Sequence, residues 1–350
     1  MVSDKRVALR RFDGYRFPFL IVLLCCLIVG GAIMSIGLGA SDVQWSLIMQ
    51  SVFYPSLEPA IAMVIWDMRA PRVILALLIG MHFAVSGLIL QRVLHNPLAE
   101  PSVLGISSGA TLAVMIWLFA SVFAGVSDTS RLITVSSSFI PIMAQLGGVL
   151  GIAIVYGLAM QGGVEPTRFV LMGAVVTAFL YAGAMVILVG WGSSRIEVVL
   201  TWLAGNLYGR EWPHVQLILP WTLFMLLFLP VLLPSLQILA LGSDDVARSL
   251  GLNVEVARFI AIAFAGCAAA TAVGIAGPIA FIGLLAPHLA RLLVGGSLKR
   301  CVPVSLLLGA LITLLADLIG RIVVLPAEIP VGAVTPLLGA PFFLYLLAKR

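Results

Sequence analysis

The sequence predicts an all-α polytopic membrane protein with about ten transmembrane helices, and two observations support this fold class. Of the 350 residues, 61% are hydrophobic and only 10% are charged, whereas a soluble domain carries about 25% charged residues. Most of the surface must therefore face lipid. Many apolar runs also approach the ~20 residues with which a helix crosses a bilayer, while the strands of a membrane barrel are about half as long and alternate.

The apolar runs define ten predicted spans within a single domain that covers residues 1–350. The first run follows a basic head and is longer than the core of a secretory signal, so we expect it to be retained as a helix. No linker, charge run or low-complexity tract divides the chain. The predicted spans are 17–38, 73–93, 103–124, 139–160, 168–190, 214–239, 257–276, 279–295, 303–323 and 334–348.

The basic residues predict the orientation of this bundle. Ten crossings return the chain to its starting side, so both termini share one face. Of the 20 Lys and Arg residues, 14 fall on that face and 6 on the other. Because cytoplasmic loops carry an excess of Lys and Arg, we expect both termini in the cytoplasm. This placement also accounts for the net charge of +5, so nucleic-acid binding is not predicted.

The sequence lacks the motifs of common catalytic and metal sites. It contains no G-x-x-x-x-G-K-[ST] loop for ATP, and no G-x-S-x-G, H-E-x-x-H or C-x-x-C motif. His95 has no companion ligand at metal spacing, and the four cysteines fit packing positions. We therefore expect a non-enzymatic chain with no catalytic residue, cofactor or metal site of its own.

Two arginines, Arg69 and Arg72, lie just before the second span on the face where basic residues are scarce. Pro71 suits the first turn of the helix that follows. The arginines could anchor this helix at the interface, with Asp67 as a neighbour, or they could form a cationic docking point for an acidic partner. The residues alone leave both interpretations open.

A polar segment at 242–252 is too short to span the membrane. Ser243 can cap a short helix, acidic residues at 244–245 suit its first turn, and Gly251 can end it. This helix is expected between two spans on the cytoplasmic side. It is either an ordinary connection or a surface on which another protein presses.

Asp317 is the one acid that lies securely within a predicted span. An intramembrane acid needs a partner, and we expect Arg321, one helical turn away, to form an ion pair with it. A proton relay normally needs more than one such acid. A proton-coupled secondary transporter is therefore kept only as an alternative.

The chain resembles the FecCD-type permeases of ABC importers for iron complexes and cobalamin. The matching pieces occur in family order over nearly the whole chain and are Arg69-Ala-Pro-Arg72, Asn96-Pro-Leu98 with Pro101, Leu104-Gly105-Ile106, Ser249-Leu250-Gly251, Gly277 to Arg291, Asp317 with Arg321, and Glu328-Ile-Pro-Val-Gly332. The resemblance implies the type II ABC importer permease architecture in a bacterial inner membrane. It also implies a second permease subunit (identical or a close paralogue), two cytoplasmic ATP-binding subunits and a periplasmic substrate-binding protein.

The resemblance further assigns roles to particular residues. Outer arginines would dock acids of the binding protein, and the attraction should be sensitive to salt because these charges are expected to face water. The segment 242–252 would couple to the ATPase, and the fifth helix would line the translocation path. The residues carried over are Arg69, Arg72 and Arg321 for docking, Arg248, Ser249, Leu250 and Gly251 for coupling, and Met172 and Thr177 for the path.

The segment 201–212 is most similar to that of the ferric-siderophore members of the family. The resemblance therefore implies import of a ferric siderophore from periplasm to cytoplasm, with haem and cobalamin as alternatives. A zinc or manganese importer would show His, Asp or Glu inside the spans, which this chain largely lacks. A membrane-embedded transferase would gather acids or histidines at one face, and none are gathered here.

Overall fold

The computed structural model describes residues 2–39, 45–54, 56–124, 139–160, 166–190, 196–325 and 327–348. Four of the basic residues counted for the orientation lie outside the described residues; they are Arg131, Arg195, Lys349 and Arg350.

The described residues form helices and no strand. A π-helical turn η1 precedes α4, and a 3₁₀ turn η2 precedes α5. The elements are α1 (Val2–Gly37), α2 (Trp45–Phe53), α3 (Pro59–Met63), η1 (Val64–Arg69), α4 (Ala70–Val93), η2 (Pro101–Val103), α5 (Ile106–Ala124), α6 (Ile140–Met160), α7 (Pro166–Gly190), α8 (Ile196–Leu203), α9 (Trp212–Leu239), α10 (Asp244–Ser249), α11 (Val254–Ala276), α12 (Ile282–Val294), α13 (Leu298–Ile322) and α14 (Val331–Ala348).

Each of the ten predicted spans coincides with an observed helix. Among the described residues, seven helices are long and apolar enough to cross a membrane, and three shorter apolar helices, in α5, α12 and α14, account for the remaining spans. The second span differs most from the prediction, because α3, η1 and α4 run on as one apolar helix from Pro59 to Val93. The short helices α2 and α8 were not predicted.

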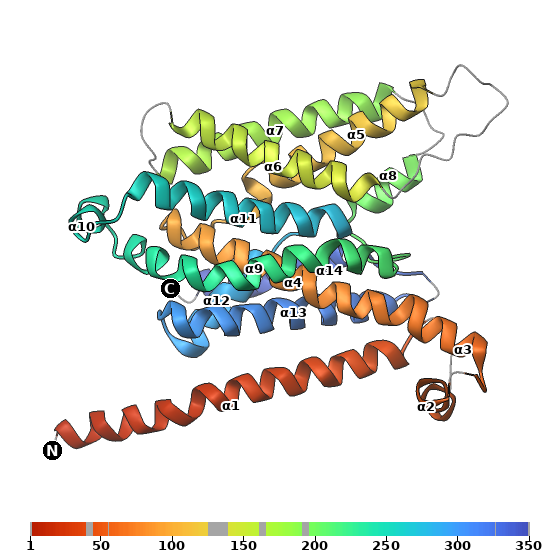
Figure 1. The fold of residues 1–350 in the computed structure, drawn as a ribbon, viewed down its shortest axis with the longest axis horizontal. Coiled ribbons are helices and arrows are strands. Elements are labelled where there is room, and N and C mark those ends of the chain that lie inside the picture. Colours follow the sequence, from red (N-terminus) through yellow and green to blue (C-terminus); the bar gives the residue numbers. More distant parts are fainter. Residues whose placement is uncertain are drawn as a thin grey trace.

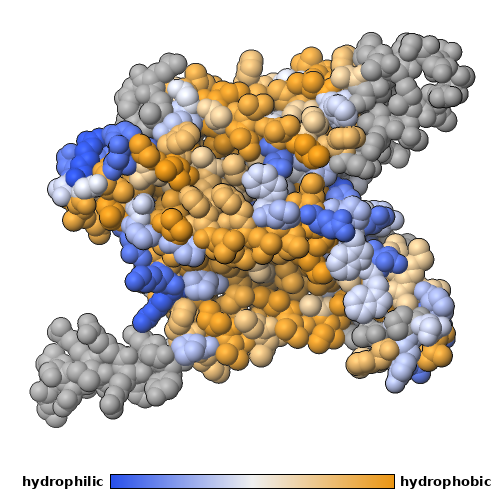
Figure 2. Space-filling model, viewed as in Figure 1, coloured by the Kyte–Doolittle hydropathy of each residue, from blue (hydrophilic) through white to orange (hydrophobic). Residues whose placement is uncertain are grey.

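The long helices lie roughly parallel and form one bundle, with α1 along one edge and α5 to α7 along the opposite edge (Figure 1). Both chain ends and α10 lie at one end of the bundle, while α2 and α3 lie at the other. The sides of the bundle are largely hydrophobic and the hydrophilic surface gathers toward its two ends (Figure 2). This distribution is the one expected of a protein whose sides face lipid.

Helix α4 is the central element, because it packs against α9, α11, α12 and α13. Close approach depends on small residues, since Gly80 lies against Gly309 of α13 and Gly87 against Gly283 of α12. Polar side chains add interhelical hydrogen bonds. The buried ring of His82 contacts Ala268 O of α11 through Nδ1 and Thr222 Oγ1 of α9 through Nε2, both at 3.0 Å.

Candidate functional site

The end of the bundle opposite the chain termini holds a network of arginines and acids that comes from helices far apart in the chain. Arg69 is the last residue of the π-helical turn η1, and Arg72 follows Pro71 in the first turn of α4. The turn also leaves the carbonyl of Trp66 available, and it accepts a hydrogen bond of 2.8 Å from Trp212 Nε1 at the start of α9. The two arginines are thereby fixed between α1, α9 and α13.

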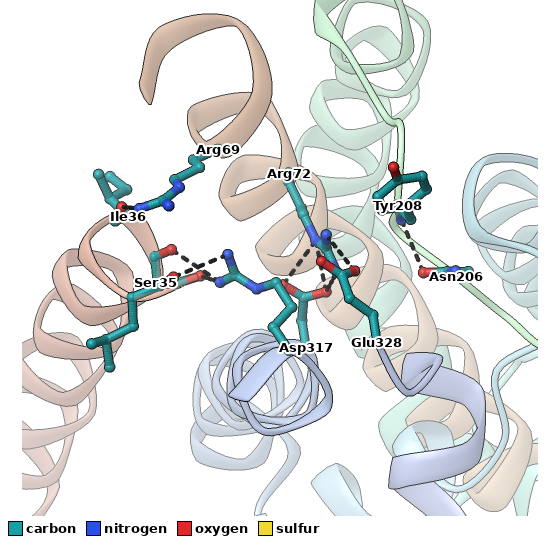
Figure 3. Close-up of polar contacts among 10 residues, drawn as sticks. Ser35, Ile36, Arg69, Arg72, Asn206, Tyr208, Asp317 and Glu328 are labelled. Atoms are coloured by element: carbon teal, nitrogen blue, oxygen red, sulfur yellow. Dashed lines mark hydrogen bonds and ion pairs between the residues drawn. The ribbon is translucent and has the colours of Figure 1, made fainter. Parts of the chain in front are cut away.

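Arg72 lies between two acids (Figure 3). Its Nη2 is 2.8 Å from Asp317 Oδ1, and its Nη1 is 2.9 Å from Glu328 Oε2. The predicted ion pair within α13 is confirmed, because Arg321 Nε lies 3.2 Å from Asp317 Oδ2. Asp317, whose side chain is fully buried, is therefore shared by two guanidiniums. The second partner comes from α4 and was not predicted.

Arg69 and Arg321 also bind the end of α1. Arg69 Nη1 donates to the carbonyls of Ile36 at 2.6 Å and Gly37 at 2.9 Å, and Arg321 Nη2 donates to Ser35 O at 3.0 Å. The last carbonyls of a helix lack partners within it and carry partial negative charge. The two guanidiniums supply those partners, and they attach α1 to α4 and α13.

The expectation that these three arginines face water is wrong. Arg69, Arg72 and Arg321 are only 7%, 8% and 4% exposed in the isolated chain. The physical reason is that cations at the edge of an apolar bundle are stabilised by acids and helix-end carbonyls, both of which are at hand here. Their role in docking a partner remains a prediction.

A cavity of about 360 Å³ opens at this end of the bundle. It is lined by the three arginines, by Glu328, and by a segment that precedes α9, residues 208–211. Within that segment Glu211 is engaged as the cap of α9, where its side chain accepts from the backbone of His214. The acids beside the cavity are therefore already committed to partners within the chain.

Arg210 differs from the other arginines of the cavity. Among the described side chains it forms no ion pair, its Nε has no hydrogen-bond partner, and its Nη1 contacts only His214 Nε2, at 3.3 Å. Burial lowers the pKa of its guanidinium below the usual value. In the sequence, segment 201–212 indicated only the class of substrate, and Arg210 was not predicted as a site residue. An arginine placed just before the predicted sixth span, on the side poor in basic residues, was the available signal.

At the opposite end, the predicted short helix at 242–252 is confirmed as α10. The Oγ of Ser243 accepts from Val246 N at 3.3 Å, and Gly251 ends the element with φ +82°. A left-handed residue at this position favours glycine. Arg258 of α11, itself buried, pairs with Asp244 at 2.8 Å and so holds α10 against the bundle.

The residues predicted for coupling lie on the surface of α10 and the turn after it. Leu250 is 56% exposed and Val246 is 44% exposed, although both are apolar. Arg248 Nη2 lies 2.7 Å from Glu255 Oε1, and this hydrogen bond raises the pKa of the Arg248 guanidinium. Ser249 Oγ donates to Val246 O at 2.8 Å. Two apolar side chains are thus presented to water beside a fixed charge pair.

The predicted path residues lie on α7. Met172 is half-buried, and Thr177 Oγ1 accepts from Gly105 N at 2.9 Å and donates to Val103 O at 3.1 Å. Thr177 thus fastens α7 to the start of α5, and its role in a path remains a prediction. A separate cavity of about 260 Å³ contains neither residue and is lined by small or uncharged side chains of Ser102, Ser107, Leu203, Ala204, Pro278, Ile279, Ala280, Gly332 and Ala333.

Glu100 is a buried acid between α4 and α5, with an exposure of 9%. Its carboxylate accepts from the backbone N–H of Phe281, the residue before α12, whose φ is +72°. Burial raises the pKa of Glu100. The contact supports the break between α11 and α12, which lines the smaller cavity.

No group of three His, Cys, Asp or Glu side chains that could hold a metal ion occurs in the described part of the chain. His95, considered as a ligand in the sequence, donates from Nε2 to Leu239 O at 2.9 Å.

A helical bundle with lipid-facing sides and polar clusters at both ends is typical of a membrane transport subunit. The chain belongs to the FecCD transport family, whose family model matches residues 25–349.

Among its relatives is the Fe(3+)-citrate import system permease protein YfmE of Bacillus subtilis, 36% identical over 93% of this chain and 94% of the relative. The iron(3+)-hydroxamate import system permease protein FhuG of the same organism is 38% identical, over 92% and 94%. The Fe(3+) dicitrate transport system permease protein FecD of Escherichia coli is 35% identical, over 94% and 98%.

The fold is similar to a solved structure described as a metal-chelate type ABC transporter in an inward-facing conformation. The TM-score is 0.79 at 26% identity, with 95% of this chain and 100% of the other covered. This likeness confirms the predicted all-α permease architecture.

Proposed function

We propose that this chain is the membrane-spanning permease subunit of an ATP-driven importer that moves a ferric siderophore from periplasm to cytoplasm. The observation that carries the proposal is that relatives matched over almost their whole length are permeases for ferric citrate and ferric hydroxamates. The subunit would lie in a bacterial inner membrane with both termini in the cytoplasm. That orientation agrees with the common end of the bundle at which both termini and α10 lie (Figure 1).

The working assembly would contain a second permease subunit, two cytoplasmic ATP-binding subunits and a periplasmic binding protein. Helix α10 supports the ATPase contact, because Val246 and Leu250 expose apolar surface at the end of the bundle that carries the termini. Burial of such side chains in a groove of the ATPase would be favourable. Closure of the ATPase dimer would then displace α10, and Arg258 would transmit the movement to α11 through Asp244.

The outer cavity is the proposed contact for the binding protein. Arg69, Arg72 and Arg321 are engaged within the chain, so their charge would act mainly through the field in the cavity. Arg210 has no acidic partner among the described residues and would donate directly to a carboxylate of the binding protein. Such charge-assisted hydrogen bonds are the strong ones.

Uptake of radiolabelled iron by a deletion strain and its complemented twin tests the proposal. Iron would be supplied as ferric citrate, as ferric hydroxamates and as haem, with labelled cobalamin in parallel. Uptake of one ferric siderophore that is lost on deletion and restored by the gene is the expected result. If the gene restored uptake of haem or cobalamin instead, the proposed substrate would be wrong, but the proposed importer function would stand. Unchanged uptake of every complex, with redundant importers also deleted, would refute the proposal.

A second arm checks whether transport depends on ATP. Transport by proteoliposomes that contain the assembled importer should require ATP inside and should continue when the proton gradient is collapsed. Transport that needs the gradient and not ATP would favour the proton-coupled alternative.

A further inference from the structure

Two arginines meet at the cytoplasmic end of the bundle, where α4 and α12 end beside the turn into α13. Arg92 Nη2 donates to Gly296 O in that turn at 2.9 Å. Arg291 Nη1 donates to Gln91 Oε1 at 2.6 Å, and Gln91 in turn donates to Gly283 O at 3.0 Å. Two helices, α4 and α12, and the turn after α12 therefore hold the two guanidiniums in position.

Among the described side chains, no acid neutralises the positive charge of this pair. Among the described side chains neither Arg92 nor Arg291 forms an ion pair, unlike Arg72 at the outer end. The two guanidiniums are close enough to repel one another. In addition, the buried Nε of Arg92 and Nη2 of Arg291 have no hydrogen-bond acceptor.

Such an arrangement is unfavourable without a further group. A buried N–H without an acceptor is destabilising, and more so when it is charged. Two repelling cations held by backbone and amide acceptors therefore indicate that an anion completes the cluster. Close by in the chain, Lys299 and Arg300 follow in the first turn of α13, and the thiol of Cys301 donates to Gly295 O.

The surroundings indicate which anion fits. Leu292 and Leu293, next to Arg291, are 60% and 53% exposed and continue the apolar side of the bundle. Figure 2 shows hydrophilic surface beside this apolar side, where Figure 1 places the turn between α12 and α13. Anionic lipids are concentrated in the cytoplasmic leaflet, and basic pockets between helix ends bind their headgroups.

We propose that Arg92 and Arg291 bind a phosphate group, and that this phosphate belongs to an anionic lipid of the cytoplasmic leaflet. The guanidinium fork matches a phosphate, which offers several acceptor oxygens at once. The exposed leucines receive the acyl chains, and Lys299 and Arg300 lie at the rim. The bound lipid links the ends of α4, α12 and α13.

The test measures the melting temperature of the purified subunit in neutral detergent with three additions, which are phosphatidylglycerol, phosphatidylcholine and inorganic phosphate. A ligand that binds only the folded state raises the melting temperature. We expect phosphatidylglycerol alone to raise it. In Arg291→Gln and in Arg92→Gln the lipid affinity should fall roughly tenfold or more, since hydrogen bonds to charged groups contribute about 1.5–3 kcal/mol.

Arg168→Gln is the matched control, because it removes one charge at the start of α7 on the same face and should keep the full lipid effect. Arg291→Lys retains the charge without the fork and should keep part of it. Several results would overturn the proposal: an equal rise with phosphatidylcholine, a full rise in Arg291→Gln, or no rise at all. A full rise in melting temperature with inorganic phosphate alone would support a phosphate site but refute the proposal that the phosphate belongs to a lipid. If Arg291→Gln lost assembly with the ATPase while lipid left the melting temperature unchanged, the two arginines would bind an acidic protein partner, and the lipid proposal would be refuted.

Discussion

The two ends of the bundle both carry residues that the family resemblance assigns to partner contacts, but the burial of these residues differs. At the end opposite the chain termini, Arg69, Arg72 and Arg321 are buried and hold α1, α4 and α13 together. At the end that carries the termini, Leu250 and Arg248 of the α10 region lie on the surface. A sequence motif can thus mark a position that supports a contact surface as well as one that forms it.

This comparison predicts the largest effect for Asp317→Asn. The substitution leaves Arg72 with one acid and Arg321 with none, and breaking a buried ion pair by removing one partner costs about 3–5 kcal/mol. We expect a strong fall in the yield of folded protein and in its melting temperature. Thermal melts of the purified subunit, with Glu328→Gln as the less buried control, measure the effect.

If Asp317→Asn melts like the parent protein, the shared acid does not stabilise the bundle. The double variant Asp317→Asn with Arg321→Gln separates the pair from its parts. The double variant also removes the Arg321 guanidinium, which Asp317→Asn leaves buried without an acid, so it should recover part of the lost stability. A double variant that melts no higher than Asp317→Asn would contradict the proposed pairing.

The second prediction concerns Leu250→Asp at the opposite end. Because this side chain is exposed, the fold should survive, whereas a buried charge in the proposed ATPase groove should abolish assembly. Co-purification of the ATPase with the tagged permease measures it, and Leu250→Met is the volume-conserving control. If the ATPase still assembled with Leu250→Asp, α10 would not form the coupling contact.

The third prediction distinguishes a structural arginine from a docking arginine. Arg69→Gln should lower the melting temperature, because it removes donors from the end of α1. Arg210→Gln should leave the melting temperature nearly unchanged, since it breaks no ion pair among the described residues. It should instead weaken the binding protein's affinity roughly tenfold, as expected when a charge-assisted hydrogen bond is lost.

Titration of the binding protein onto the reconstituted permease at low and high salt checks this prediction. The parent affinity should fall with salt and the Arg210→Gln affinity should fall less, because one charge of the pair is gone. If the binding protein kept its normal affinity for Arg210→Gln but bound Arg69→Gln more weakly, docking would depend on the arginines that the family resemblance indicates and not on Arg210.

The ten spans could be predicted because length and hydropathy act along the chain and do not depend on neighbours. The ion pair of Asp317 with Arg321 was also predictable, since the two residues are one turn apart on a single helix. The contact of Asp317 with Arg72 was not, because it crosses 245 positions and depends on how α4 packs on α13. The burial of Arg69, Arg72 and Arg321 follows from the same packing. The exposure of these arginines was therefore predicted wrongly, although the ion pair that depends only on spacing within α13 was predicted correctly.

The smallest expected effect is at Glu100, whose pKa is raised by burial. A carboxyl group with a raised pKa holds its proton more tightly in the folded state, so its contribution to stability falls as pH rises from its ordinary value of 4.5 toward the raised value. Glu100→Gln keeps an oxygen that can accept from Phe281 N–H and removes the charge. The melting temperature of Glu100→Gln should therefore depend less on pH above about 4.5 than that of the parent, with little loss at neutral pH. Parallel melts between acidic and neutral pH decide this, and a variant that loses stability only as the pH approaches neutrality would show that the charged carboxylate is required to support the break before α12.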